Sequence, residues 1–185
     1  MSLPADSFVL YLLYYLKINN HVNTTGNIGH RSPLLSTQEL LKHWQGHRGL
    51  TRKMIEAFPE DRLFTYSIGG MRPFSDLVYE FLGMAVPGLQ GIATGKWQKW
   101  ADADKVNTKA ALLQLWDAAT DEINAIWPTI PLHRFAEQDV AFGLWPGTCL
   151  SFLFYFIDNE IHHRGQAYVY LRSLSIEPPA FWDRP

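Results

Sequence analysis

Hydrophobic residues recur at intervals of three and four positions in four segments of this chain, and this period predicts four amphipathic helices. The segments cover residues 36–58, 73–94, 107–127 and 148–173. The sequence shows no strand-period alternation of any length, and residues 128–147 are expected to be irregular. Together these features predict an all-α fold built as a four-helix bundle, in which the two longer connections allow crossovers.

Local signals mark where the predicted helices begin and break. Ser36-Thr37-Gln38-Glu39 is a capping box, in which Ser36 caps the helix and Glu39 reaches back to the Ser36 amide. Pro73 occupies a favourable first-turn position of the second helix. Pro87 is expected to kink or divide that helix, because proline removes a backbone donor.

The N-terminal part of the chain differs from the rest. Residues 3–18 are strongly apolar but shorter than the roughly 20 residues that a membrane helix needs. No basic segment precedes them, so a signal peptide is not predicted. Residues 19–35 show no periodicity and have the composition of a linker. We therefore expect residues 1–35 to be an extension and linker, and residues 36–185 to form the bundle domain.

Composition narrows the range of partners. Hydrophobic residues make up 47% of the 185 positions and charged residues only 18%, which favours self-association. The formal net charge is −2 and the basic residues are scattered, so we expect neither nucleic acid nor a membrane as a partner. Cys149 is the only cysteine, and a reducing cytoplasm is the simplest location for the protein.

One stripe of the last predicted helix is aromatic at both ends and polar in the middle. It consists of Phe152, Tyr155, Phe156, Asn159, His163, Gln166 and Tyr170. Buried polar groups need partners, since leaving one unpaired costs on the order of 1–3 kcal/mol. The polar members of this stripe therefore either hydrogen-bond to one another and to neighbouring helices, or surround a metal ion or a polar ligand.

Four further residues invite specific interpretations. His43 and His47 have the i, i+4 spacing of a metal chelate, but a core or pocket-lining His47 is the favoured interpretation. Gly165 lies inside a predicted helix, where glycine costs about 1 kcal/mol relative to alanine, so a neighbouring helix is expected to approach closely there. Arg164 is expected to form an interhelical salt bridge rather than to contact an anionic substrate.

Two segments carry a resemblance to a known family. Glu160-Ile161-His162-His163-Arg164-Gly165-Gln166, continued by Tyr168-Val169-Tyr170-Leu171-Arg172, resembles the last-helix signature of the DinB/YfiT-like superfamily. Phe74-Ser75-Asp76-Leu77-Val78-Tyr79-Glu80-Phe81 resembles the second-helix segment of that family. The resemblance covers roughly residues 36–185. It implies a DinB-like four-helix bundle with one crossed connection, commonly a homodimer.

The resemblance also implies a divalent metal site, built from a histidine on the second helix and a His-x-x-x-His pair on the last. Those three positions fall on Glu80, Asn159 and His163. A carboxylate, an amide and an imidazole form a harder ligand set than three imidazoles, so they favour Mg²⁺, Mn²⁺, or loosely held Zn²⁺ or Ni²⁺. Alternatively the metal has been lost, with Glu80 and His163 forming an ion pair that Asn159 bridges.

Two functions follow from the resemblance. The first is a metal-dependent enzyme, a thiol-dependent S-transferase or a related hydrolase or isomerase, in which the ion activates a small-molecule thiol. His47, Tyr155, Gln166 and Tyr170 would then line the pocket. The second is a non-catalytic dimeric bundle that binds a small molecule or has a stress-associated role, with a degenerated metal site.

Overall fold

A computed structural model describes residues 35–101 and 103–184. The apolar segment at residues 3–18, and nearly all of the expected extension and linker, lie outside the described residues. The helices and strands follow one another along the chain in this order: α2 (Thr37–Ala57), α3 (Glu60–Leu63), α4 (Phe74–Thr94), α5 (Lys109–Ile126), η1 (Trp127–Thr129), η2 (Leu132–Ala136), β1 (Gln138–Ala141), β2 (Trp145–Thr148) and α6 (Cys149–Ser173). The four long helices confirm the predicted helical segments.

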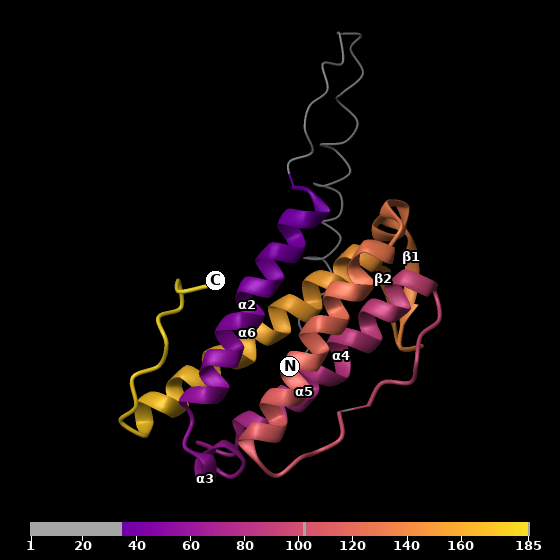
Figure 1. The fold of residues 1–185 in the computed structure, drawn as a ribbon. Coiled ribbons are helices and arrows are strands. Elements are labelled where there is room, and N and C mark those ends of the chain that lie inside the picture. Colours follow the sequence, from indigo (N-terminus) through magenta and orange to yellow (C-terminus); the bar gives the residue numbers. More distant parts are fainter. Residues whose placement is uncertain (1–34, 102, 185) are drawn as a thin grey trace, which may run out of the picture. The chain divides into compact units, whose positions relative to one another are not determined.

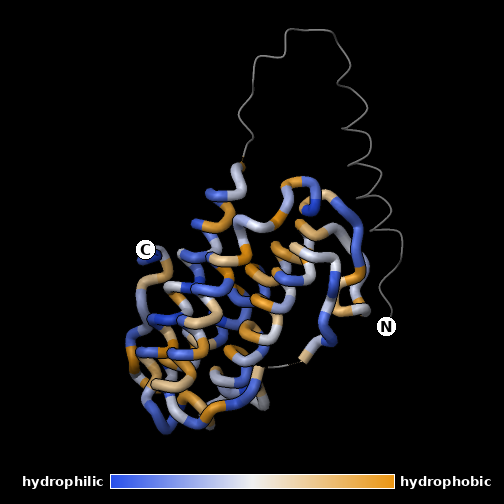
Figure 2. The backbone as a smooth tube through the Cα atoms, turned by 45° about the vertical axis from the view of Figure 1, so that its right-hand side comes forward, coloured by the Kyte–Doolittle hydropathy of each residue, from blue (hydrophilic) through white to orange (hydrophobic). Residues whose placement is uncertain are grey.

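The four long helices form a bundle in which α2 and α4 each pack against both α5 and α6 (Figure 1). Two pairs of consecutive long helices, α2 with α4 and α5 with α6, are therefore not principal neighbours, and this arrangement is the expected crossed connection. Hydrophobic and hydrophilic positions alternate about once per turn along these helices, as Figure 2 shows. Within the described ranges, no helix combines the length and the apolar character needed to cross a bilayer.

The predicted helix starts are confirmed by their hydrogen bonds. The Glu39 amide donates to Ser36 Oγ over 3.1 Å, while the Ser36 amide donates to the Glu39 carboxylate over 2.7 Å. Thr108 and Thr148 cap α5 and α6 in the same way with their hydroxyl oxygens. Pro87 lies inside α4, and the helix continues beyond it to Thr94. Pro87 therefore does not divide this helix.

The segment expected to be irregular contains an antiparallel hairpin instead. In the pairing of β1 with β2, Gln138 lies opposite Thr148 and Ala141 lies opposite Trp145. Phe142 and Gly143 turn the chain with φ angles of 54° and 73°. The strands are only four residues long, and Pro146-Gly147 interrupts the second, so no alternating pattern develops in the sequence. The bundle is thus a helical fold with a small hairpin attached.

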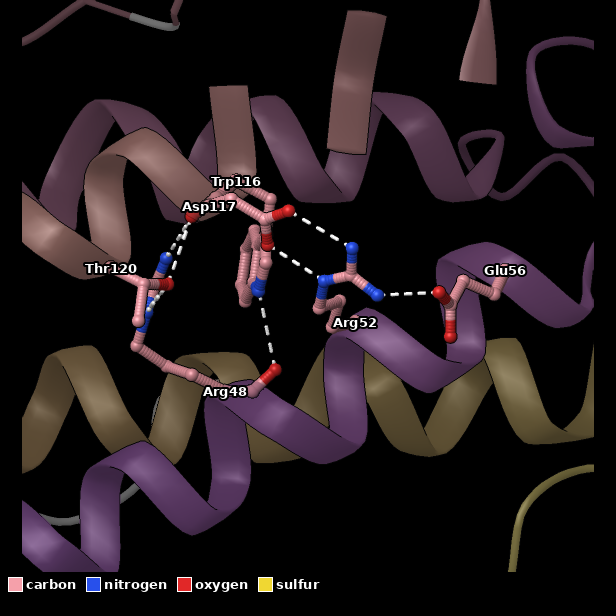
Figure 3. A network of polar contacts seen from close by, with 6 residues as sticks. All are labelled: Arg48, Arg52, Glu56, Trp116, Asp117 and Thr120. Carbon is pink, nitrogen blue, oxygen red and sulfur yellow. Dashed lines mark hydrogen bonds and ion pairs between the residues drawn. The ribbon is translucent and has the colours of Figure 1, made fainter. Parts of the chain in front are cut away.

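Arginine side chains from α2 fasten this helix to α5 (Figure 3). Arg52 binds Asp117 through two hydrogen bonds, from Nε to Oδ1 at 2.7 Å and from Nη2 to Oδ2 at 2.9 Å. The buried Arg48 donates to Thr120 Oγ1 at 2.9 Å and to the Trp116 carbonyl at 3.1 Å. Its guanidinium also lies 3.9 Å from the centroid of the Trp116 ring. Paired geometry of this kind fixes the register between the two helices.

A second buried polar network joins α2 to α6. Arg164 Nη1 donates to the His47 carbonyl at 3.1 Å and to Thr51 Oγ1 at 3.0 Å, and Thr51 donates to Glu160. Arg164 also lies 3.5 Å from the Glu160 carboxylate, one turn away on the same helix. The expectation of an interhelical salt bridge at Arg164 was therefore wrong: the ion pair is within α6, and hydrogen bonds cross to α2.

The close approach expected at Gly165 occurs at a different glycine. A β-carbon added to Gly165 would meet nothing within 4 Å, because this position faces solvent. A β-carbon added to Gly88 in α4 would lie 2.4 Å from the Phe156 ring of α6. Sequence periodicity does not distinguish these two helical glycines, since the difference lies in the partner helix. The prediction for Gly165 was wrong, and Gly88 is where α4 and α6 touch.

Replacing these glycines by alanine should have opposite effects. Gly88→Ala forces the buried Phe156 ring to move, which should destabilise the protein by about 1–3 kcal/mol. Gly165→Ala, the matched control, should be neutral or stabilise by up to about 1 kcal/mol, because it adds a better helix former in open space. Urea unfolding measures both; equal stability of the two variants would contradict the packing described here.

The stability of the fold should fall as the pH drops from 7 to 5, with His47 as a main cause. Burial, followed by Arg164 of α6, His43 of α2 and Arg184 near the C-terminus, lowers the pKa of His47 to about 4. Unfolded histidine titrates near about 6.5, so between these values the unfolded state binds a proton that the folded state does not. Stability is therefore complete above about pH 6.5 and decreases as the pH falls towards 4.

The variant His47→Gln provides the measurement. It keeps the backbone carbonyl that Arg164 uses but removes the titrating imidazole. We expect the denaturation midpoint of this variant to change less between pH 7 and pH 5 than that of the wild type. The same pH dependence in both proteins would show that His47 does not titrate as described.

Candidate functional site between α4 and α6

Helices α4 and α6 bring together the three positions that the family resemblance implies for a metal. Asn159 Nδ2 donates to Glu80 Oε1 over 3.0 Å. The same carboxylate oxygen lies 3.5 Å from His163 Nε2. Asn159 and His163 are one turn apart on α6, and Glu80 faces them from α4, where it stands beside the apolar stripe. All three side chains are largely withdrawn from solvent.

His163 is held by contacts on both sides of its ring. Its Nδ1 lies 3.4 Å from Gln166 Oε1, and the Phe81 ring stacks against it with centroids 6.1 Å apart. When Nδ1 carries the proton and donates to Gln166, Nε2 presents a lone pair towards the Glu80 carboxylate. Two electron-rich atoms then face each other across 3.5 Å. Such an arrangement attracts a proton or a cation.

The electrostatic surroundings keep the carboxylate charged and the imidazole neutral. Burial raises the pKa of Glu80, but the hydrogen bond from Asn159 and the ion pair with Arg72 outweigh it, so the pKa lies below its usual value. Burial lowers the pKa of His163, and Gln166 and Glu80 compensate only in part. At neutral pH both groups are therefore in the protonation states that bind metal ions.

Arg72 is a member of the site that the sequence did not indicate. Its Nη2 lies 2.5 Å from Glu80 Oε2, on the side of the carboxylate away from His163. Tyr170, fully buried on α6, donates its hydroxyl to the Arg72 carbonyl over 3.0 Å. Tyr170 thus holds the loop that carries Arg72. No periodic signal marks Arg72, because it lies in the connection before α4.

The spacing of Glu80, Asn159 and His163 fits a divalent ion, although the Arg72 guanidinium already pairs with Glu80. Atoms bound to one ion at about 2.0–2.2 Å lie roughly 3.0–3.5 Å from each other, which matches the separations of Glu80 Oε1 from Asn159 and His163. Asn159 would need to present its oxygen, which an amide flip provides. In the described part of the chain no three His, Cys, Asp or Glu residues gather into a group that could hold a metal ion; beside Glu80 and His163 the remaining candidate donor is the Asn159 amide.

Glu80 also belongs to the lining of a cavity of about 620 Å³, a volume typical of small-molecule sites. Its walls come from α4, the connection after α4, the hairpin and the first turns of α6. The lining residues are Glu80, Met84, Trp100, Ala141, Phe142, Leu144, Trp145, Pro146, Ser151, Phe152, Tyr155 and Phe156. The polar cluster therefore meets the cavity through Glu80.

The four residues expected to line a pocket lie in different places. Tyr155 lines the cavity and is 59% exposed. Gln166 contacts His163, and Tyr170 anchors the Arg72 loop. His47 is not among the lining residues; it lies between Arg164 and Arg184, 2.8 and 3.0 Å from their guanidinium nitrogens. The aromatic walls from the hairpin and from Trp100 were not predicted.

Comparison with known proteins gives a consistent picture of the fold. A DinB-like protein from Bacillus cereus ATCC 10987 superposes with a TM-score of 0.64 at 16% identity, covering 77% of this chain and 95% of the other. A DinB-like protein from Bacillus subtilis superposes with a TM-score of 0.65 at 21% identity, covering 79% and 99%. A mycothiol-dependent maleylpyruvate isomerase is more distant, with a TM-score of 0.56, 11% identity, and coverage of 71% and 61%.

The family assignment rests on the sequence itself. No curated protein matches the chain significantly. The model of the DinB family, however, matches residues 31–183, which include α2, α4, α5 and α6 in full. The fold shared with the two Bacillus proteins agrees with this match. We conclude that this chain belongs to the DinB family.

Proposed function

We propose that the protein is a metal-dependent enzyme that uses a low-molecular-weight thiol, of the S-transferase or isomerase type. The observation that carries this proposal is the meeting of Glu80 Oε1 and His163 Nε2 at 3.5 Å beside a cavity of about 620 Å³. The similarity of fold to a mycothiol-dependent isomerase is in keeping with the proposed reaction class. Mg²⁺ and Mn²⁺ suit the carboxylate and amide oxygens best, with Zn²⁺ or Ni²⁺ held more loosely.

Each side chain has a defined task in this proposal. Glu80 and His163 would hold the ion, and Asn159, on the same face of α6 as His163, would complete the donor set. Gln166 fixes the imidazole so that Nε2 is free to coordinate. A divalent ion at this position would lower the pKa of a coordinated thiol and so supply a thiolate at neutral pH. The aromatic walls exclude water from the reacting groups.

The ion pair between Arg72 and Glu80 favours a second candidate function, a metal-free protein that binds a small molecule. In this case Arg72 supplies the positive charge that balances Glu80, and Asn159 and His163 complete a closed hydrogen-bond network. The cavity would then serve for binding without catalysis. The two candidates differ in whether Arg72 competes with a metal ion or replaces it.

The metal content of the purified protein distinguishes the metal-dependent enzyme from the metal-free binding protein. Wild-type protein from medium supplemented with Mn²⁺, Zn²⁺ and Ni²⁺ should contain close to one metal ion per chain by mass spectrometry. His163→Ala should lose most of it, because it removes the one imidazole of the donor set. His162→Ala is the matched control and should retain the metal, since His162 is exposed and, although it contacts Gln166 and the His163 ring, is not one of the proposed ligands. Metal-free wild-type protein would support the second candidate.

Neutralising Arg72 should strengthen metal binding. In Arg72→Gln the carboxylate loses a competing cation on Oε2, and the repulsion between guanidinium and metal disappears. We expect the dissociation constant for Mn²⁺ or Zn²⁺ to fall by roughly tenfold, equivalent to about 1.4 kcal/mol. Isothermal titration calorimetry measures it. If Arg72→Gln instead binds no metal and unfolds more easily, the guanidinium is a structural partner of Glu80.

A further inference from the structure

The walls of the cavity beside Glu80 have an unusual chemical composition. Half of the lining residues are aromatic, and they come from three parts of the chain: Trp100, Phe142, Trp145, Phe152, Tyr155 and Phe156. Among the described residues that line it there is no Lys, Arg or His, and Glu80 alone is charged at neutral pH. Arg72 is turned to Glu80 and is not part of the lining.

The aromatic rings form a connected wall with its centre at Phe142. The Phe142 ring contacts the Trp145 ring edge-on at a centroid distance of 6.1 Å and the Phe156 ring at 6.4 Å. Phe142 has a φ angle of 54°, a conformation that non-glycine residues seldom adopt, and this turn directs the hairpin residue into the wall. Gly88 lets Phe156 lie directly against α4. The backbone therefore accommodates these rings both at Phe142, through its positive φ angle, and at Gly88, through the missing side chain.

Charge then restricts what the cavity can hold. The faces of aromatic rings carry partial negative charge, and the one charged side chain among the described lining residues, Glu80, is an anion that Arg72 balances from outside the lining. An anionic ligand would lose its hydration without gaining a cationic partner from the walls. A planar apolar ring, in contrast, gains both burial and ring–ring contacts on several sides.

We propose that this cavity binds aromatic small molecules that carry no negative charge, and that such a molecule is the substrate of the thiol-dependent reaction. The assignment of such a molecule as the substrate rests on the proposed function, because it assumes that the site beside Glu80 is catalytic. The binding preference itself follows from the walls alone. Trp145 and Tyr155 line the cavity and are 50% and 59% exposed, so a ligand that enters from solvent contacts them.

Two fluorescent probes with the same skeleton test the preference. N-phenyl-1-naphthylamine is neutral, and 8-anilino-1-naphthalenesulfonate adds one sulfonate to the same two ring systems. Titration of the full-length wild-type protein should give a dissociation constant for the neutral probe at least tenfold lower than for the sulfonate. Equal or tighter binding of the sulfonate would overturn the proposal.

Two exposed tryptophans provide the site control. Trp145→Ala should weaken binding of the neutral probe at least fivefold, because it removes part of the cavity rim. Trp182→Ala should leave it unchanged, since Trp182 is 72% exposed and does not line the cavity. Both positions are solvent-accessible, so both variants should fold. An unaffected Trp145→Ala variant would show that the probe binds elsewhere and would overturn the assignment.

A third variant tests the role of charge. Glu80→Gln keeps the shape of the side chain but leaves Arg72 without its carboxylate partner, so the base of the cavity becomes more positive. Discrimination against the sulfonate should then shrink at least threefold. Unchanged discrimination would contradict the electrostatic part of the inference.

The probes are titrated with metal-depleted protein, so that the result is independent of metal binding. A wild-type protein that holds metal through His163 but prefers the anionic probe would refute this inference and leave the proposed function intact. A protein without metal that selects the neutral probe would refute the proposed enzyme and leave the binding preference intact.

Discussion

The register between α4 and α6 is the constraint on which the site depends. Gly88 of α4 lies against Phe156 of α6, and Glu80 lies against His163, so the two helices run antiparallel with matching spacings of about two turns. A helix that slid by one turn would bury the Phe156 ring against a side chain instead of a glycine. The same packing that fits a ring to Gly88 therefore brings the carboxylate to the imidazole.

Once Glu80 is held between the helices, its charge has to be balanced. A largely buried carboxylate without a partner would be costly, and Arg72 supplies a positive charge to one of its two oxygens. Arg72 satisfies Oε2, while Oε1 faces Asn159 and the neutral His163. One oxygen thus pairs with a cation of the protein itself, and the other accepts the Asn159 hydrogen bond and faces the imidazole of His163.

The sequence predicted those parts that depend on periodicity and capping. Ser36 begins α2 as its capping box predicted, α5 and α6 begin within two residues of the predicted starts at 107 and 148, and the crossed bundle follows from the family resemblance. Features that depend on contact with another helix or strand could not be predicted from the sequence. Gly88 and Gly165 look alike in a helical pattern, yet only the first touches another helix. The hairpin lacks any strand period, since its second strand contains Pro146-Gly147.

The two parts of the site, the polar cluster and the ring wall, differ in how far sequence periodicity predicts them. The polar cluster is built on the regular helices α4 and α6, at positions that a helical repeat and a family motif identify. Half of the ring wall comes from α6, while the other half comes from Trp100 in a connection and from Phe142 and Trp145 of the hairpin, where no repeat applies. Connections vary more freely than packed helices, because they carry fewer packing constraints. The choice of ligand is therefore expected to lie in the connections, and the chemistry in the helices.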